Sequence, residues 1–123
     1  MPMIITVCDT CKRPGWDPET TEITDGAALA ALVETAIDPE SGIEFRRHSC
    51  LMGCDFGCNL TLQDDGKISY ALGLFEPTED AAAAIVDFAG KYAESETGQV
   101  PYKTWPQGVK GHFRARIPAP PKP

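Results

Sequence analysis

The sequence predicts a single α/β domain with the element order β-α-β-β-β-α, a mixed sheet and an irregular C-terminal tail. Its 123 residues are the length of one domain and are enough to bury a core without disulfides. Short apolar and β-branched runs alternate with stretches of helical periodicity, which is the pattern of an α/β protein. An Asp-Gly turn between two alternating runs predicts a hairpin, so antiparallel strands accompany the parallel ones.

The first half of the chain predicts a strand, a helix and a second strand. The run MIITV is apolar and β-branched and predicts a buried strand that ends at Cys8. Asp25 is expected to cap a helix, which the segment DPESG ends. The buried face of this helix follows the i, i+3, i+4, i+7, i+8 spacing and contains Leu29, Leu32, Val33, Ala36 and Ile37. Residues 43–47 then alternate as a second strand, which leads into a cysteine-rich loop.

The second half of the chain predicts a hairpin and a helix. Residues 60–63 form its first strand, the segment DDGK turns the chain, and the return strand has an apolar face: Ile68, Tyr70, Leu72 and Leu74. A helix begins at Pro77 or Thr78, and its buried side contains Ala81, Ile85, Phe88, Ala89 and Tyr92. We expect residues 1–97 to form the domain and residues 98–123 to form a Pro-rich, basic extension that packs on it. The remaining large aromatic side chains are expected only to pack: Trp16, Tyr102, Trp105 and Phe113.

Charge is distributed unevenly along the chain. Residues 1–99 hold all 18 acidic residues and 6 of the 11 basic ones, a net charge of −12, whereas the tail from Val100 carries +5. Such an acidic body repels phosphates, so nucleic acid is not an expected partner. It suits docking on a basic surface of a redox partner protein, although the basic tail could instead fold over the acidic body and balance it.

The sequence also bears on the compartment in which the protein works. No apolar run reaches the roughly 20 residues of a membrane span, and the start MPMIITVC lacks the basic residues of a secretory signal. We therefore expect a cytoplasmic protein without a membrane partner, whose thiols stay reduced. The odd count of five cysteines argues against a disulfide framework. The sequence leaves room for a homodimer.

The five cysteines are the strongest functional signal. Cys8 and Cys11 follow the first strand, and Cys50, Cys54 and Cys58 follow the second. Because a right-handed crossover leaves these strands parallel, both groups should reach the same edge of the sheet. Reduced, clustered thiolates select zinc or iron-sulfur clusters, and a cluster commonly takes four cysteine ligands. The glycines at positions 53 and 57 would let the backbone curl closely around a cluster, although each also suits an ordinary turn.

Three other interpretations stay open. A zinc site is the main alternative, but only C-x2-C has the usual zinc spacing, and His48 beside two arginines is typical of a solvated surface residue. A dithiol oxidoreductase would need a helix N-terminus directly under Cys8, against which Pro14, Gly15 and Pro18 argue. In the third interpretation all five cysteines are inert core residues, but structural cysteines have no reason to cluster in a loop.

The segments VCDTC, SCLMGCDFGCNLTL and DGKISYAL resemble the thioredoxin-like 2Fe-2S ferredoxins. The resemblance implies a thioredoxin-like fold and a 2Fe-2S cluster held by four ligands: Cys8, Cys11, Cys50 and Cys54. Tyr70 stands where these ferredoxins have an aromatic residue. The sequence departs from these ferredoxins in two features. Its first cysteine pair, C-x2-C, is more closely spaced, and Cys58 stands in place of the usual proline. Cys58 could be an inert thiol, a substitute ligand for Cys11 or a site of oxidation.

Over its whole length the chain resembles more closely a bacterial family of predicted metal-binding proteins of unknown function, often encoded near cobalamin synthesis genes. The resemblance implies an electron donor or a metal-handling accessory in corrinoid metabolism. We expect a one-electron carrier rather than an enzyme. The alternative is a cysteine-ligated zinc or cobalt protein that handles metal without transferring electrons.

Overall fold

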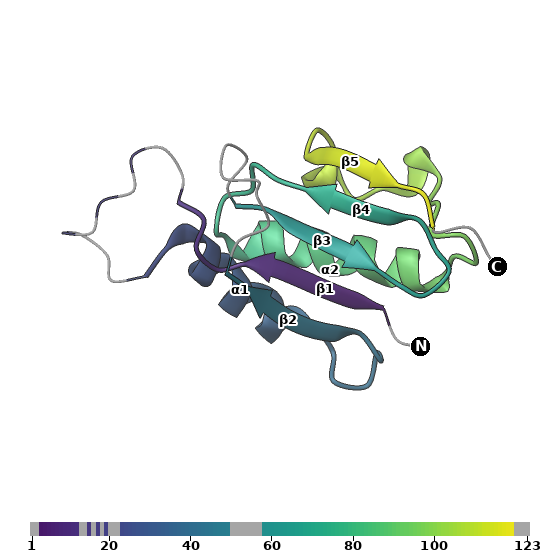
Figure 1. Ribbon diagram of the computed structural model, residues 1–123, viewed down its shortest axis with the longest axis horizontal. Helices are drawn as coiled ribbons and strands as arrows, with labels where there is room; N and C mark the ends of the chain where they lie inside the picture. Colours follow the sequence, from purple (N-terminus) through teal and green to yellow (C-terminus); the bar gives the residue numbers. More distant parts are fainter. Residues whose placement is uncertain are drawn as a thin grey trace.

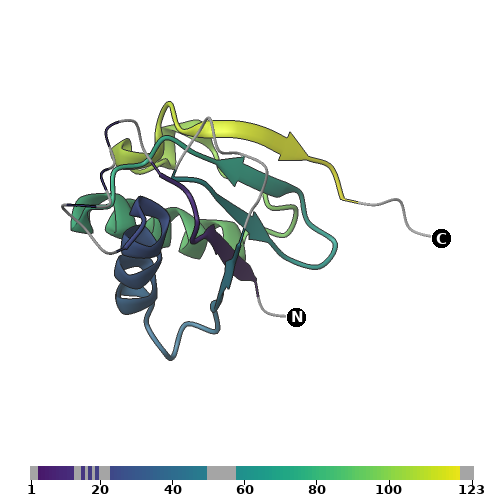
Figure 2. The same cartoon turned by 60° about the vertical axis from the view of Figure 1, so that its left-hand side comes forward.

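The computed structural model describes residues 3–12, 15, 17, 19, 23–49 and 58–119 (Figure 1). They form one five-stranded mixed sheet with the strand order β2-β1-β3-β4-β5. The strands are β1 (Ile4–Cys8), β2 (Glu44–His48), β3 (Leu60–Gln63), β4 (Ser69–Leu72) and β5 (Phe113–Ile117), and the α-helices are α1 (Asp25–Ala36) and α2 (Glu79–Glu94). Both helices lie on the same face of the sheet (Figures 1 and 2). This arrangement is consistent with the predicted thioredoxin-like α/β fold.

The two strands joined by the first crossover are parallel, as predicted. β1 pairs in parallel with β2, with Ile4 opposite Glu44 and Cys8 opposite His48. On its other side β1 pairs antiparallel with β3. β1 therefore lies inside the sheet, and its C-terminal end meets the end of β2 and the start of β3.

The core lies between the sheet and the two helices. α1 buries Leu29, Ala30 and Val33, whereas Ala36, predicted on the same face, is exposed at the last turn. α2 begins after Thr78, whose hydroxyl accepts a hydrogen bond from the Ala81 amide. Its buried residues are Ala82, Ala84, Ile85, Phe88, Ala89 and Tyr92, which confirms most of the predicted face. Thr24 rather than Asp25 caps α1 and accepts a hydrogen bond from the Ala27 amide at 3.1 Å.

The hairpin is confirmed, but its return strand is shorter than predicted. Gly66 has a φ of +76° in the Asp-Gly turn, and the Lys67 Nζ lies 3.0 Å from the Asp64 carboxylate. Tyr70 and Leu72 are buried as predicted. Leu74 is 45% exposed, so its predicted place on the buried face is wrong. Its φ of 64° ends the strand alternation and turns its side chain outward.

The C-terminal extension is more regular than the sequence suggested. After α2 the chain forms two 3-10 turns, η2 (Tyr102–Thr104) and η3 (Gln107–Val109), and then β5 pairs antiparallel with β4. Val109 is completely buried, and Phe113 packs against the core. The alternation of Phe113, Ala115 and Ile117 with two arginines is a strand pattern, which the neighbouring prolines and glycines obscured. The extension thus adds a fifth strand to the sheet.

No helix in the part of the chain that the structure describes is long and apolar enough to cross a membrane.

Candidate metal centre

Cys8 lies at the edge of the sheet where the parallel strands β1 and β2 end and β3 begins. It is the last residue of β1, and its amide donates a hydrogen bond to the Asn59 carbonyl oxygen at 3.1 Å. On the other side the Asp9 amide donates to the His48 carbonyl oxygen, also at 3.1 Å. His48 and Asn59, which precede and follow residues 50–57 in the sequence, are therefore held on opposite sides of the Cys8 backbone.

Cys50 and Cys54, predicted as the second ligand pair, lie outside the described residues. The residue before them is Ser49, whose carbonyl oxygen is 3.9 Å from the Cys8 Sγ and also accepts a hydrogen bond from the Thr10 hydroxyl. Cys8 is thus contacted by Ser49, which precedes residues 50–57, and by Asn59, which follows them.

The first predicted pair is brought together. The Sγ atoms of Cys8 and Cys11 are 3.0 Å apart, and the side chains of both residues are buried, at 1% and 2% exposure. The Thr10 hydroxyl is 3.5 Å from the Cys8 Sγ. Two shielded thiols at a strand end can bind a thiophilic metal as thiolates or form a disulfide.

Asn59 is a site residue that no sequence motif marked. Its Oδ1 lies 3.0 Å from the Cys11 Sγ, while its backbone oxygen holds the Cys8 amide. The side chain is buried, and a buried amide needs hydrogen-bond partners. The available signal was weak: a polar residue between Cys58 and the first apolar residue of a strand.

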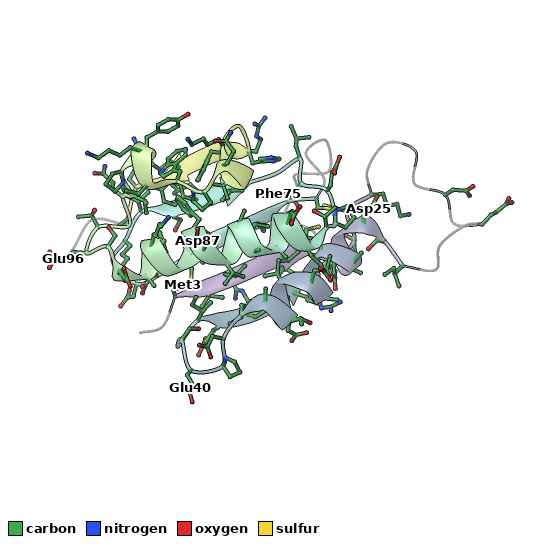
Figure 3. The ribbon with its side chains drawn as sticks, turned by 180° about the vertical axis from the view of Figure 1, so that it is seen from behind. Met3, Asp25, Glu40, Phe75, Asp87 and Glu96 are labelled. Atoms are coloured by element: carbon green, nitrogen blue, oxygen red, sulfur yellow. The ribbon has the colours of Figure 1, made fainter. Side chains whose placement is uncertain are left out.

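The start of α1 packs on residues 8–11, which we call the cysteine turn. Figure 3 shows Asp25, at the start of α1, close to the sulfur atoms. The Gly26 amide donates to the Cys11 carbonyl oxygen at 2.9 Å, and the Thr24 hydroxyl donates to the Asp9 carbonyl oxygen. A Cβ at Gly26 would overlap the Cys8 carbonyl oxygen. Pro14, Gly15 and Pro18 argued against a helix N-terminus directly under Cys8, whereas the start of α1, a later helix, packs against the backbone of Cys8 and Cys11.

Cys58 and His48 differ from the close pair. Cys58 is completely buried, and its backbone exchanges two hydrogen bonds of 3.4 Å with Phe75. His48 is exposed at the end of β2, in agreement with a surface role. Among the described residues, no three cysteine, histidine or acidic side chains assemble as a metal site.

A family model described as "Protein of unknown function (DUF1636)" matches residues 5–119. The chain belongs to the DUF1636 family. The matched region contains all five cysteines and the whole sheet except Ile4. No curated protein and no solved structure matches the chain. For this DUF1636 chain, the cysteine edge is therefore the main guide to function.

Proposed function

We propose that the protein is a one-electron carrier with a 2Fe-2S cluster bound by Cys8, Cys11, Cys50 and Cys54. The observation that carries the proposal is the position of Cys8. Its thiol is 3.0 Å from that of Cys11, and Cys8 is also contacted by Ser49 and Asn59, which lie on either side of residues 50–57 in the sequence. Four thiolates are the ligand set that such clusters commonly take.

The described donor set fits a cluster of this kind. Cys8 supplies one sulfur ligand at the end of an inner strand, and Cys11 supplies a second from the residues that follow this strand. Their burial shields this side of the site from water, and Thr10 and Asn59 supply polar groups beside the sulfurs. Such neighbours tune the potential of an iron-sulfur centre. When bound, the cluster would supply the one-electron chemistry, and these residues would hold, shield and tune it.

The acidic body supports a carrier that meets basic partners. Complementary charge raises the encounter rate of two proteins more than it raises their final affinity. Asp9 follows Cys8 directly and is partly exposed, so negative charge lies at the edge that would exchange electrons. On the sequence resemblance alone, we extend the proposal to an electron donor in corrinoid metabolism.

The first experiment is an ultraviolet-visible spectrum with iron, zinc, cobalt and acid-labile sulfide analysis of protein purified without oxygen. About two iron and two sulfide per chain, with visible bands that bleach under dithionite, would support the proposal. A colourless protein with one zinc, or a cobalt protein without sulfide, would replace it with the metal-handling alternative.

A second candidate function is thiol-disulfide exchange by Cys8 and Cys11. The 3.0 Å separation of their sulfurs and the first turn of α1 packed on the same turn favour it. The N-terminal end of a helix carries a partial positive charge, which lowers the pKa of a thiol placed next to it. In this reaction the two thiols form a disulfide, and the two electrons and two protons reduce a disulfide of the substrate to two thiols. Turnover of insulin disulfides by metal-free protein would support this function, and a Cys11→Ser variant with the same rate would exclude it.

A further inference from the structure

A second candidate site lies on the helix face of the sheet, away from Cys8 and Cys11. A cavity of about 520 Å³ is bounded by β4, β5, the chain after α2, and η2. Its lining includes Tyr70, Val100, Tyr102, Trp105 and Arg116. A smaller cavity of about 290 Å³ shares Tyr70, Trp105 and Arg116 with it and extends along β5. The two cavities together form one site, which we call the β5 pocket.

The β5 pocket is separate from the cysteine edge. Tyr70 is opposite Leu62 of β3, and Leu62 is opposite Ile5 of β1. Cys8 is three residues further along β1, which corresponds to about 10 Å in an extended strand. A ligand in the β5 pocket would therefore be recognised by residues that the proposed cluster does not use.

A β-bulge explains why these side chains meet. Arg116 is opposite Tyr70, and Phe113 is opposite Leu72, with a register shift between Ala71 and Leu72. In a regular strand, residues three apart face opposite sides of the sheet. The extra residue in β5 lets Phe113 and Arg116 share the face of Tyr70. The bulge thus places a guanidinium beside an aromatic cluster.

The aromatic wall of the pocket is held in place. The Trp105 indole donates a hydrogen bond to the Val100 carbonyl oxygen at 2.8 Å. Its ring centroid is 4.4 Å from that of Phe113 and 4.9 Å from that of Tyr102. Tyr102 is 62% exposed, although its sequence context predicted only a packing role. One face of the cavity therefore offers preorganised rings to a ligand.

Tyr70 supplies a buried donor without a protein acceptor. The residue is 3% exposed, yet its hydroxyl forms no hydrogen bond with any residue in the described part of the chain. Every fully buried side-chain nitrogen or oxygen in that part has a partner. The Tyr70 hydroxyl must therefore keep contact with solvent, and the β5 pocket is the space that Tyr70 lines.

The charge of the pocket is positive. Arg116 forms no ion pair with any described residue, Arg114 lines the smaller cavity, and neither cavity has an acidic lining residue among those described. Lys110 lies over the Tyr102 ring with its Nζ 4.8 Å from the centroid. In a chain of net charge −7, this is a local site for an anion.

We propose that the β5 pocket binds a small aromatic anion, a flat ring that carries a phosphate or carboxylate group. The ring would stack on Trp105 and Tyr102, and the anion would bind Arg116 with the Tyr70 hydroxyl as a second donor. A guanidinium binds phosphate and carboxylate with two parallel hydrogen bonds, which gives it selectivity for these groups. This inference does not depend on the proposed electron-carrier function.

The test is isothermal titration calorimetry of the full chain with two aromatic anions, AMP and 2-naphthoate. Two matched probes serve as controls: adenosine, which lacks the charge, and inorganic phosphate, which lacks the ring. We expect saturable binding of at least one aromatic anion, at least about tenfold tighter than binding of either matched probe. The better anion distinguishes a phosphate site from a carboxylate site. Absence of binding by both anions at millimolar concentration, or equal binding of adenosine and AMP, would overturn the proposal.

Variants assign the binding to this pocket. Arg116→Gln and Tyr70→Phe should each weaken binding of the aromatic anion by at least about fivefold. Arg47→Gln, an exposed arginine on the edge strand β2, is the matched control and should leave it unchanged. An equal loss in Arg47→Gln would show non-specific charge attraction and contradict the proposal. A thermal melt of each variant checks that Tyr70→Phe is folded, and Arg116→Gln gives an answer independent of the core.

Discussion

The Sγ of Cys11 lies 3.0 Å from the side-chain oxygen of Asn59, a residue 48 positions away in the sequence. The same asparagine holds the Cys8 amide through its backbone oxygen. Asn59 therefore links both thiols of the close pair to the start of β3. If Cys11 is a thiolate ligand, rotation of the Asn59 amide would place an N-H donor at the sulfur.

Replacing Asn59 should then change the potential of the cluster. Hydrogen bonds to cluster sulfurs raise the potential, so Asn59→Ala should lower it by about 40 mV, the equivalent of one hydrogen bond of roughly 1 kcal/mol. Asn59→Asp should lower it further, because a carboxylate repels the added electron. A dithionite titration followed by visible absorbance measures both, with Gln63→Ala as the control. An unchanged potential in Asn59→Asp would remove Asn59 from the site.

Single-cysteine variants should separate ligands from the core thiol. Cys8→Ser and Cys11→Ser should lose iron and the visible bands, because each removes a thiolate ligand. Cys58→Ala should keep both, and should lower the free energy of unfolding by about 1 kcal/mol because it leaves a small cavity in the core. The measurement is the content of iron and acid-labile sulfide per chain in each variant. Loss of iron in Cys58→Ala together with its retention in Cys11→Ser would exchange the roles of these two residues.

Gly26→Ala should destabilise the protein strongly. The new Cβ would overlap the Cys8 carbonyl oxygen and lie 3.1 Å from the Cys11 amide nitrogen. The backbone of α1 or of residues 8–11 must therefore move to accommodate it. We expect a loss of about 2–4 kcal/mol in the free energy of unfolding, measured by urea denaturation. Gly90→Ala is the matched control, because a Cβ there meets nothing within 4 Å, and it should stabilise α2 by about 1 kcal/mol. A similar effect at both positions would contradict the packing of α1 on the cysteine turn.

Tyr92 should make the protein sensitive to alkaline pH. Burial, followed by the negative charge of Asp64, raises the pKa of Tyr92 from 10.0 to about 12. The folded state therefore holds this proton more tightly than the unfolded state. The resulting stability is complete below pH 10 and is lost as the pH rises toward 12. Urea unfolding at pH 7 to 12 should show a steeper alkaline loss for the wild type than for Tyr92→Phe, and parallel curves would refute the assignment.

Electron transfer to a basic partner should weaken with salt. Screening shortens the range of the attraction, so the rate of reduction of a basic c-type cytochrome should fall several-fold between low and physiological ionic strength. Asp9→Asn, next to Cys8, should lower the low-salt rate more than Glu40→Gln, which is exposed in the connection between α1 and β2. A rate that is independent of salt would rule out electrostatic docking.

The sequence by itself determined the elements that depend on local pattern. The apolar spacing of Leu29 and Val33, and of Ile85, Phe88 and Tyr92, sets the buried faces of the two helices. The Asp-Gly turn sets the hairpin. The right-handed crossover makes β1 and β2 parallel, so that Cys8 lies opposite His48 where the two strands end.

Contacts between distant residues were decided only by the tertiary structure. Asn59 reaches Cys11, and Gly26 reaches Cys8, because β3 pairs with β1 within the sheet and the start of α1 packs on the residues that follow β1. The bulge that places Arg116 beside Tyr70 depends on the pairing of β5 with β4. No local spacing encodes these approaches, since residues far apart in sequence meet only when burial of the shared core fixes the register and the docking of whole elements.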